Sequence, residues 1–164
     1  MNIDILCVGR LKEQYLKAAT DEYSKRLSRY CRLSISEVAD EKTVDGQSEA
    51  LDKKVKETEG ERLLKNIKQD AYVIALEIEG EQLTSEKLAS RIEETGVKGF
   101  SRIQFVIGGS LGLSEEVIKR ADMHLSFSKM TFPHQLMRVI LLEQIYRSFR
   151  INNECTVIRT VKCY

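Results

Sequence analysis

The chain of 164 residues contains no tryptophan and a single proline, and its net charge is only +1. No apolar run approaches the roughly 20 residues that a membrane-spanning helix needs. Residues 1–5 lack the basic region and apolar core of a secretory signal. These absences argue against a membrane or exported protein, and a cytoplasmic location follows as the default expectation.

Cysteine and histidine are also scarce, with four of the first and two of the second. No two cysteines have the C-x-x-C spacing, and the histidines lie far from the cysteines in the sequence. A zinc site is therefore not expected, and we predict no metal. A disulfide framework would be unusual in a chain of this length without an export signal.

The near-neutral net charge does not indicate a nucleic-acid-binding protein, because such proteins usually have an excess of lysine and arginine. Local clusters matter more than totals, however. Between positions 129 and 162, six lysines and arginines stand against two glutamates. The last part of the chain is therefore where an anionic partner would bind.

Apolar periodicity divides the chain into alternating strands and helices. Strands are predicted at residues 2–8, 33–38, 71–78, 103–107 and 125–127, with a turn at 79–81. Helices are predicted at about 12–30, 50–67 and 85–94, from 115, and at 135–150. The first helix shows an apolar stripe of Leu11, Tyr15, Ala19, Tyr23 and Leu27. This alternation predicts one α/β domain over residues 1–164, with a mostly parallel sheet and helices on both faces.

Three of the strand ends are distinctive, and ligands in such sheets bind at the carboxyl ends of strands. One follows Leu76, the second is the glycine-rich run 108–112, and the third is residues 127–132. If these strands are neighbours, their loops form one pocket of backbone, hydroxyl groups and apolar walls, with one lysine and no carboxylate cluster. Such a pocket suits a weakly charged ligand with a flat ring.

Each of these loops also has a plainer interpretation. The glycine run matches neither the G-x-G-x-x-G nor the Walker A pattern, so it can equally be a tight turn. Residues 125–138 read as a short apolar strand, a polar loop and a helix that begins near Pro133, a favourable place for proline. That segment can equally be an ordinary strand-to-helix connection.

Three stretches resemble the RlmH family, the bacterial 23S rRNA pseudouridine N3-methyltransferases of the SPOUT class. They are Gly9-Arg10-Leu11-Lys12, the run 106–112, and above all residues 125–138 followed by Glu-Gln-Ile-Tyr-Arg at 143–147. The resemblance covers residues 1 to about 154. It implies a trefoil knot in the C-terminal half, a homodimer, and S-adenosylmethionine (SAM) bound by the knot loops.

The resemblance also implies which residues contact the cofactor. By position these are Leu76, Gly108, Phe127, Ser128, Lys129, Met130, Thr131 and Phe132. They fall on the same three strand ends that the residue patterns indicate.

The implied chemistry is methyl transfer to a ring nitrogen in 23S rRNA of the assembled ribosome. His134, Arg138 and Tyr164 are the catalytic candidates. Arg138, Arg147 and Arg150 are candidates for phosphate contact. His134 can equally be a structural residue at the start of a helix. Two alternatives remain open: a SPOUT methyltransferase for another RNA, and a SAM-binding, catalytically weak module on the ribosome.

The helix at 135–150 is apolar on more than one face, which is typical of a helix buried on several sides. A partner subunit would supply one of those sides, although a central helix buried within the monomer has the same pattern. The chain also departs from the family after residue 154. The related proteins end in a short Pro-Tyr-His-basic tail, whereas residues 155–164 contain no histidine and only Tyr164 could replace the lost tyrosine. We therefore expect SAM binding but poor methylation.

Overall fold

The computed structural model describes residues 1–153 and shows one parallel sheet with the strand order β2-β1-β4-β3-β5. Every pair of neighbouring strands runs in the same direction. The strands are β1 (Asn2–Val8), β2 (Arg32–Val38), β3 (Tyr72–Gln82), β4 (Arg102–Ile107) and β5 (Met123–Ser126). The predicted parallel α/β fold is confirmed, and β4, β3 and β5 are neighbours as the pocket prediction requires.

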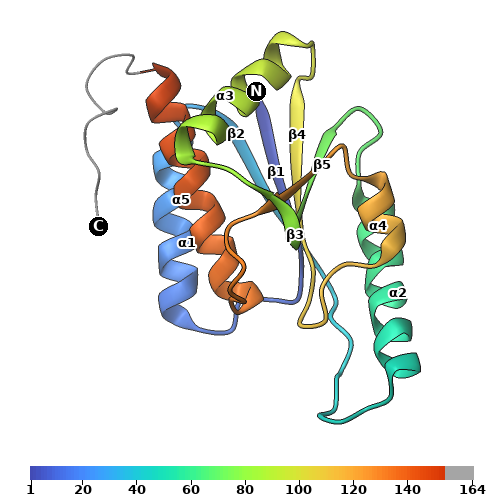
Figure 1. Cartoon of the computed structure of the whole chain (residues 1–164). Helices are drawn as coiled ribbons and strands as arrows, with labels where there is room; N and C mark the ends of the chain where they lie inside the picture. Colours follow the sequence, from blue (N-terminus) through green and yellow to red (C-terminus); the bar gives the residue numbers. More distant parts are fainter. Residues whose placement is uncertain (154–164) are drawn as a thin grey trace.

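Helices cover both faces of the sheet, as Figure 1 shows. On one face lie α1 (Gln14–Leu27), α3 (Ser85–Val97) and α5 (His134–Asn153). The other face carries α2 (Glu49–Asn66) and α4 (Glu115–Arg120). Because β1 and β4 lie inside the sheet under helices on both sides, their sequences are almost continuously apolar.

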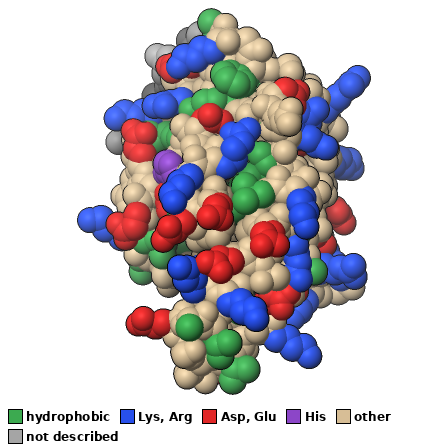
Figure 2. Space-filling view, turned by 90° about the vertical axis from the view of Figure 1, so that its right-hand side faces the viewer, with side chains coloured by type: hydrophobic (Ala, Val, Ile, Leu, Met, Phe, Trp, Pro, Cys, Tyr) green, Lys and Arg blue, Asp and Glu red, His purple; other side chains and the backbone are tan. Residues whose placement is uncertain are grey.

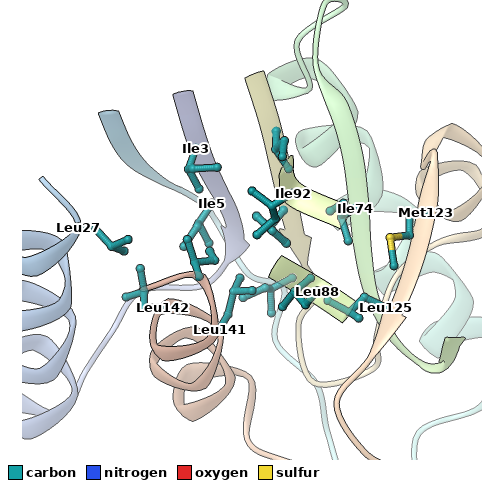
Figure 3. Close-up of a cluster of buried hydrophobic side chains, with 14 of the residues drawn as sticks. Ile3, Ile5, Leu27, Ile74, Leu88, Ile92, Met123, Leu125, Leu141 and Leu142 are labelled. Atoms are coloured by element: carbon teal, nitrogen blue, oxygen red, sulfur yellow. The ribbon is translucent and has the colours of Figure 1, made fainter. Parts of the chain in front are cut away.

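The larger core lies between the sheet and the helices α1, α3 and α5. Ile3 and Ile5 of β1 lie beside Leu141 and Leu142 of α5, and all four side chains are fully buried. Figure 3 shows these residues with Ile92 of α3 in the same cluster. Each such side chain contributes about 1.5–3 kcal/mol on burial. The apolar density of α5 is thus largely explained by contacts within this chain.

Helix starts follow local capping chemistry, whereas the buried face of α1 does not follow the predicted stripe. The Ser114 hydroxyl at the start of α4 accepts a hydrogen bond from the Val117 N–H at 3.4 Å.

In α1, Leu16, Thr20 and Leu27 face the core, and Tyr15 is 70% exposed. The predicted stripe was therefore wrong at Tyr15, because a spacing of four drifts around a helix of 3.6 residues per turn.

The predicted turn at 79–81 was also wrong, because β3 continues to Gln82 through a bulge. Leu76 and Glu81 both pair with Leu125 of β5, so the intervening residues loop outward from the ladder. Gly80 allows this, since a Cβ at that position would stand 2.7 Å from the carbonyl carbon of Leu125. The bulge places residues 77–79 at the carboxyl ends of the strands.

After β5, residues 127–133 carry the chain from the edge of the sheet back to α5, which packs against α1 and α3 (Figure 1). The C-terminal knot and the homodimer implied by the family resemblance stay predictions. Within residues 1–153, no helix combines the length and the apolar character needed to cross a membrane. The tail from 155 to 164, including Tyr164, lies outside the described residues.

Candidate functional site

A cavity of about 370 Å³ opens where β3, β4 and β5 end, a volume typical of small-molecule sites. Its walls come from the segments 76–79, 107–113 and 125–132, with His134 and Met137 of α5 completing them. Of the eight residues expected to contact a cofactor, the structure brings seven together here: Leu76, Gly108, Phe127, Ser128, Met130, Thr131 and Phe132. Lys129 is not among the lining residues. The cofactor-binding role of all eight stays a prediction.

The wall formed by residues 126–132 is held in shape by its own serines. The Ser126 hydroxyl donates to the carbonyl oxygen of Ser128 at 3.0 Å. The Ser128 hydroxyl accepts from the Met130 N–H, also at 3.0 Å. Met130 and Phe132 remain 73% and 40% exposed. This segment is therefore an ordered loop with an apolar rim between β5 and α5.

The glycine run forms the facing wall of the cavity and is also a tight turn, as its plainer interpretation predicts, while its contact with a ligand stays a prediction. Gly112 has φ +87°, a conformation that side chains disfavour, and its N–H donates to the Gly109 carbonyl at 3.1 Å. A Cβ at Gly108 would stand 2.7 Å from the backbone of Gly112. A larger residue at Gly108 would therefore distort the turn and, with it, the wall.

Two glutamates that sequence reasoning missed belong to the cavity. Glu77 and Glu79 line it through the bulge of β3, whereas Lys129 does not line it, so the expectation of one lysine and no carboxylate cluster was wrong. The Nδ1 atom of His124, on β5, lies 2.6 Å from a carboxylate oxygen of Glu77, on β3. This contact holds the Glu77 carboxylate next to β5. The sequence signal was present, because two glutamates directly follow the buried stretch of β3, but the expected turn hid it.

Arg138 anchors the first turns of α5 beneath the cavity. It is 0% exposed; its Nη1 donates to Glu37 Oε1 at 2.5 Å and its Nη2 to the carbonyl oxygen of Gly9 at 2.7 Å. The contact joins α5 to the carboxyl ends of β1 and β2. Because a fully buried guanidinium cannot reach an RNA backbone, the expected phosphate contact of Arg138 was wrong for this conformation of the chain.

His134, the first residue of α5, lines the same cavity. Partial burial lowers the pKa of its imidazole below the ordinary 6.5, the positive charge of Arg138 lowers it further, and Asp40 opposes both. The imidazole is therefore neutral near pH 7 and able to accept a proton. This placement combines the two interpretations of His134, as a helix-start residue and as a group in the site.

The two candidates for RNA contact lie further along α5. Arg147 forms an ion pair with Glu143 at 2.7 Å, and the Arg150 guanidinium lies 5.9 Å from the ring centre of Tyr146. On the opposite side of the molecule, over α2 and α4, basic and acidic side chains are interspersed (Figure 2).

Residues 1–153 contain no group of three or more histidine, cysteine or acidic side chains placed to hold a metal ion.

Comparison with known proteins identifies the family. A family model described as "Predicted SPOUT methyltransferase" matches residues 1–156. The chain belongs to the SPOUT methyltransferase family.

Within this family, the chain is 64% identical over 152 residues to a Bifidobacterium animalis protein named Ribosomal RNA large subunit methyltransferase H, covering 93% of this chain and 96% of that protein. A Clostridium novyi protein of the same name is 62% identical over 152 residues, with the same coverage. The predicted membership of the RlmH family is thereby confirmed.

A solved structure supports the fold of the SPOUT family for this chain. It is a probable methylase family protein from Haemophilus influenzae Rd KW20, with a TM-score of 0.54 and 17% identity. The match covers 99% of this chain and 71% of the solved one.

Proposed function

We propose that the protein is a SAM-dependent methyltransferase that modifies N3 of a pseudouridine in 23S rRNA of the assembled ribosome. The observation that carries the proposal is the cavity at the ends of β3, β4 and β5, lined by seven of the eight residues that family membership implies for SAM. The rRNA methyltransferases that are 62–64% identical over most of the chain support the substrate class.

The cavity fits the chemistry of SAM. Apolar walls from Leu76, Ile107 and Phe127 suit a flat purine ring. Glu77 and Glu79 offer carboxylates to the cationic amino acid end and to ribose hydroxyl groups. The absence of a side chain at Gly108 lets the glycine turn close against Gly112, which shapes this wall of the cavity.

Bound SAM supplies an activated methyl group, so the residues of this chain mainly position the two reactants and handle one proton. We assign His134 the role of accepting the N3 proton, because its neutral imidazole lines the cavity. Arg138 holds His134 in place by clamping the first turns of α5 to Gly9 and Glu37. It acts as a positioning residue rather than through contact with substrate.

The partners follow from the same geometry. The apolar side chains of Ile78, Met130 and Phe132, each 40–73% exposed, line the cavity and form its rim. A second copy of the chain would cover it, which is the homodimer that the resemblance implies. Arg147 and Arg150 are the proposed contacts to rRNA phosphates, and the reaction places the protein in the cytoplasm.

A second candidate function is a SAM-binding module that methylates weakly. It is favoured by the last ten residues, which lack the Pro-Tyr-His ending of the family. The cavity contains seven of the eight residues implied for SAM, so we expect cofactor binding to be intact. Loss of an acid or base group supplied by the tail would lower the methylation rate about 10²–10⁴-fold. Replacing residues 155–164 by Pro-Tyr-His-Lys should then raise the rate.

The experiment is a methylation assay on ribosomes that lack the modification, with mass spectrometry of digested 23S rRNA. The proposed enzyme adds one methyl group to a pseudouridine. If the parent chain methylates slowly and the grafted tail accelerates it, the weak module is correct. Methylation of tRNA alone would assign the chain to another RNA. A chain that binds no SAM in calorimetry would refute both proposals.

A further inference from the structure

Glu59 of α2 is a buried carboxyl group directly behind the glycine wall of the cavity. It is 3% exposed, and its Oε1 accepts a hydrogen bond from the Glu41 N–H at 2.9 Å. Its Oε2 is buried and has no hydrogen-bond partner among the described residues. An unsatisfied buried oxygen costs free energy. A polar atom in this position therefore calls for a functional explanation.

The Oε2 atom of Glu59, which has no hydrogen-bond partner among the described residues, faces the glycine wall of the cavity at Gly109. A Cβ at Gly109 would stand 2.7 Å from Oε2 and 3.1 Å from Oε1 of Glu59. The next residue of α2 has a similar contact, since a Cβ at Gly60 would already stand 2.1 Å from the Ser114 hydroxyl. Two successive residues of α2 therefore support both ends of the segment 109–114, which forms one side of the cavity.

The same turn of α2 also holds the segment 39–41 that follows β2. Arg62 donates to the Ala39 carbonyl oxygen at 2.8 Å and forms an ion pair with Glu41. Asp40, between them, lies near Gly9 and His134: a Cβ at Gly9 would be 3.7 Å from Asp40 Cγ and 3.5 Å from His134 Nε2. Contacts thus run from His134 on one side of the cavity to Gly109 on the other, through Glu59.

We propose that Glu59 is a positioning residue for the cofactor site. Its carboxyl group, wedged between Glu41 and Gly109, sets the glycine wall where the cofactor fits, and its free Oε2 accepts a hydrogen bond from that wall in the bound state. The inference rests on the proposed SAM site. Burial raises the pKa of the Glu59 carboxyl group above its ordinary value.

The test measures SAM binding to the purified full chain by calorimetry. Glu59→Met keeps the size of the side chain but removes the acceptor, and it should weaken binding about tenfold. Glu59→Gln keeps the shape but places an amide nitrogen, which cannot accept a hydrogen bond, where one of the two oxygens was, so it should weaken binding by a similar factor. Glu61→Met, at an exposed position of the same helix, is the matched control and should leave binding unchanged.

Kinetics separate positioning from general loss of structure. At saturating SAM, Glu59→Met should keep the kcat of the parent while its KM for SAM rises about tenfold. Gly109→Ala, which pushes the wall away from the carboxyl group, should weaken binding by a similar factor even if Glu59→Met does not fold. The two effects should combine less than additively in the double variant, because they disturb the same contact.

The outcomes are distinguishable. If the parent chain binds no SAM, the proposed function itself fails. If the parent binds SAM and Glu59→Met binds it equally well, the function stands and the role of Glu59 is refuted. Binding by Glu59→Gln as tight as that of the parent would also refute it, because the second acceptor would then be irrelevant. Additive effects of Glu59→Met and Gly109→Ala would do the same.

Discussion

The two ends of the sheet use their polar groups differently. At the amino ends of β1, β2 and β4, a groove of about 270 Å³ is lined mostly by polar residues that bind one another. Arg102 pairs with Asp4 at 2.5 Å, and Gln104 accepts from the Lys68 N–H at 2.9 Å. At the carboxyl ends, Glu59 Oε2 and Arg138 Nε are buried beside the cavity without hydrogen-bond partners among residues 1–153. At the amino ends, Arg102 Nε also lacks a hydrogen bond within these residues, but it lies 3.8 Å from an Asp70 carboxylate oxygen.

This difference separates stability from function. Polar groups that satisfy each other at the amino end contribute to the fold and leave little for a ligand. At the carboxyl end, hydrogen-bonding capacity is retained beside a cavity with apolar walls, at a cost in stability. Substitutions at the first end should therefore affect unfolding alone, and those at the second should also affect SAM binding or catalysis.

The largest effect is expected for Arg138→Met. It leaves Glu37 and the Gly9 carbonyl without their partner, and removing one member of a buried ion pair costs about 3–5 kcal/mol. The matched variant at the amino end is Arg102→Met, whose arginine is 26% exposed, and it should cost about 1–2 kcal/mol. Urea unfolding measures both, and calorimetry should show weaker SAM binding for Arg138→Met only. Equal SAM affinities of the two variants would break the comparison.

His134→Asn should slow methylation about 10²-fold, because it removes the proposed proton acceptor. In the parent, the rate should fall as the pH drops through the lowered pKa of His134, below 6.5, since protonation consumes the base. That inflection should vanish in His134→Asn. His124→Asn on β5 is the control and should keep it. Identical pH profiles of the parent and of His134→Asn below pH 6.5 would exclude His134 as the base.

Gly108→Ala should weaken SAM binding about tenfold and lower stability, because its Cβ would press on the Gly112 backbone at 2.7 Å. The control is Gly96→Ala in α3, where the nearest atom is the flexible end of Met1 at 3.0 Å. That change should stabilise the helix by up to about 1 kcal/mol and leave SAM binding unchanged. Unaltered SAM affinity in Gly108→Ala would show that the glycine wall does not belong to the SAM site.

The smallest effect is expected for Arg147→Gln. Its ion pair with Glu143 is partly exposed, so stability should change by less than about 1 kcal/mol. Binding to rRNA should weaken a few-fold and lose about one unit of its salt dependence. Filter binding at several salt concentrations measures this. An identical salt slope in parent and variant would mean that Arg147 does not contact a phosphate.

The sequence predicted the parts of the site that depend on local pattern. The ends of β4 and β5 and the cap at Ser114 are marked by apolar runs, glycines and capping residues that lie next to one another in the sequence. They can therefore be predicted without knowledge of distant contacts. Arg138 was assigned to an exposed role, because its burial depends on Glu37 and Gly9, about 100 and 129 positions away. Glu59 was hidden for a similar reason: in a charged helix, nothing local distinguishes a carboxylate behind a loop from one in solvent.

The clamp between Gly9 and Arg138 also sets an order of events during synthesis. The two residues are separated by 129 positions, so the end of the first strand cannot gain this bond until α5 has left the ribosome. Parallel pairing of β1 with β4 imposes a similar wait, and such distant contacts slow folding. The newborn chain can therefore pair β1 with β2 early, but the other edge of β1 stays without its partner until β4 has been made. The cavity closes only when the last helix arrives.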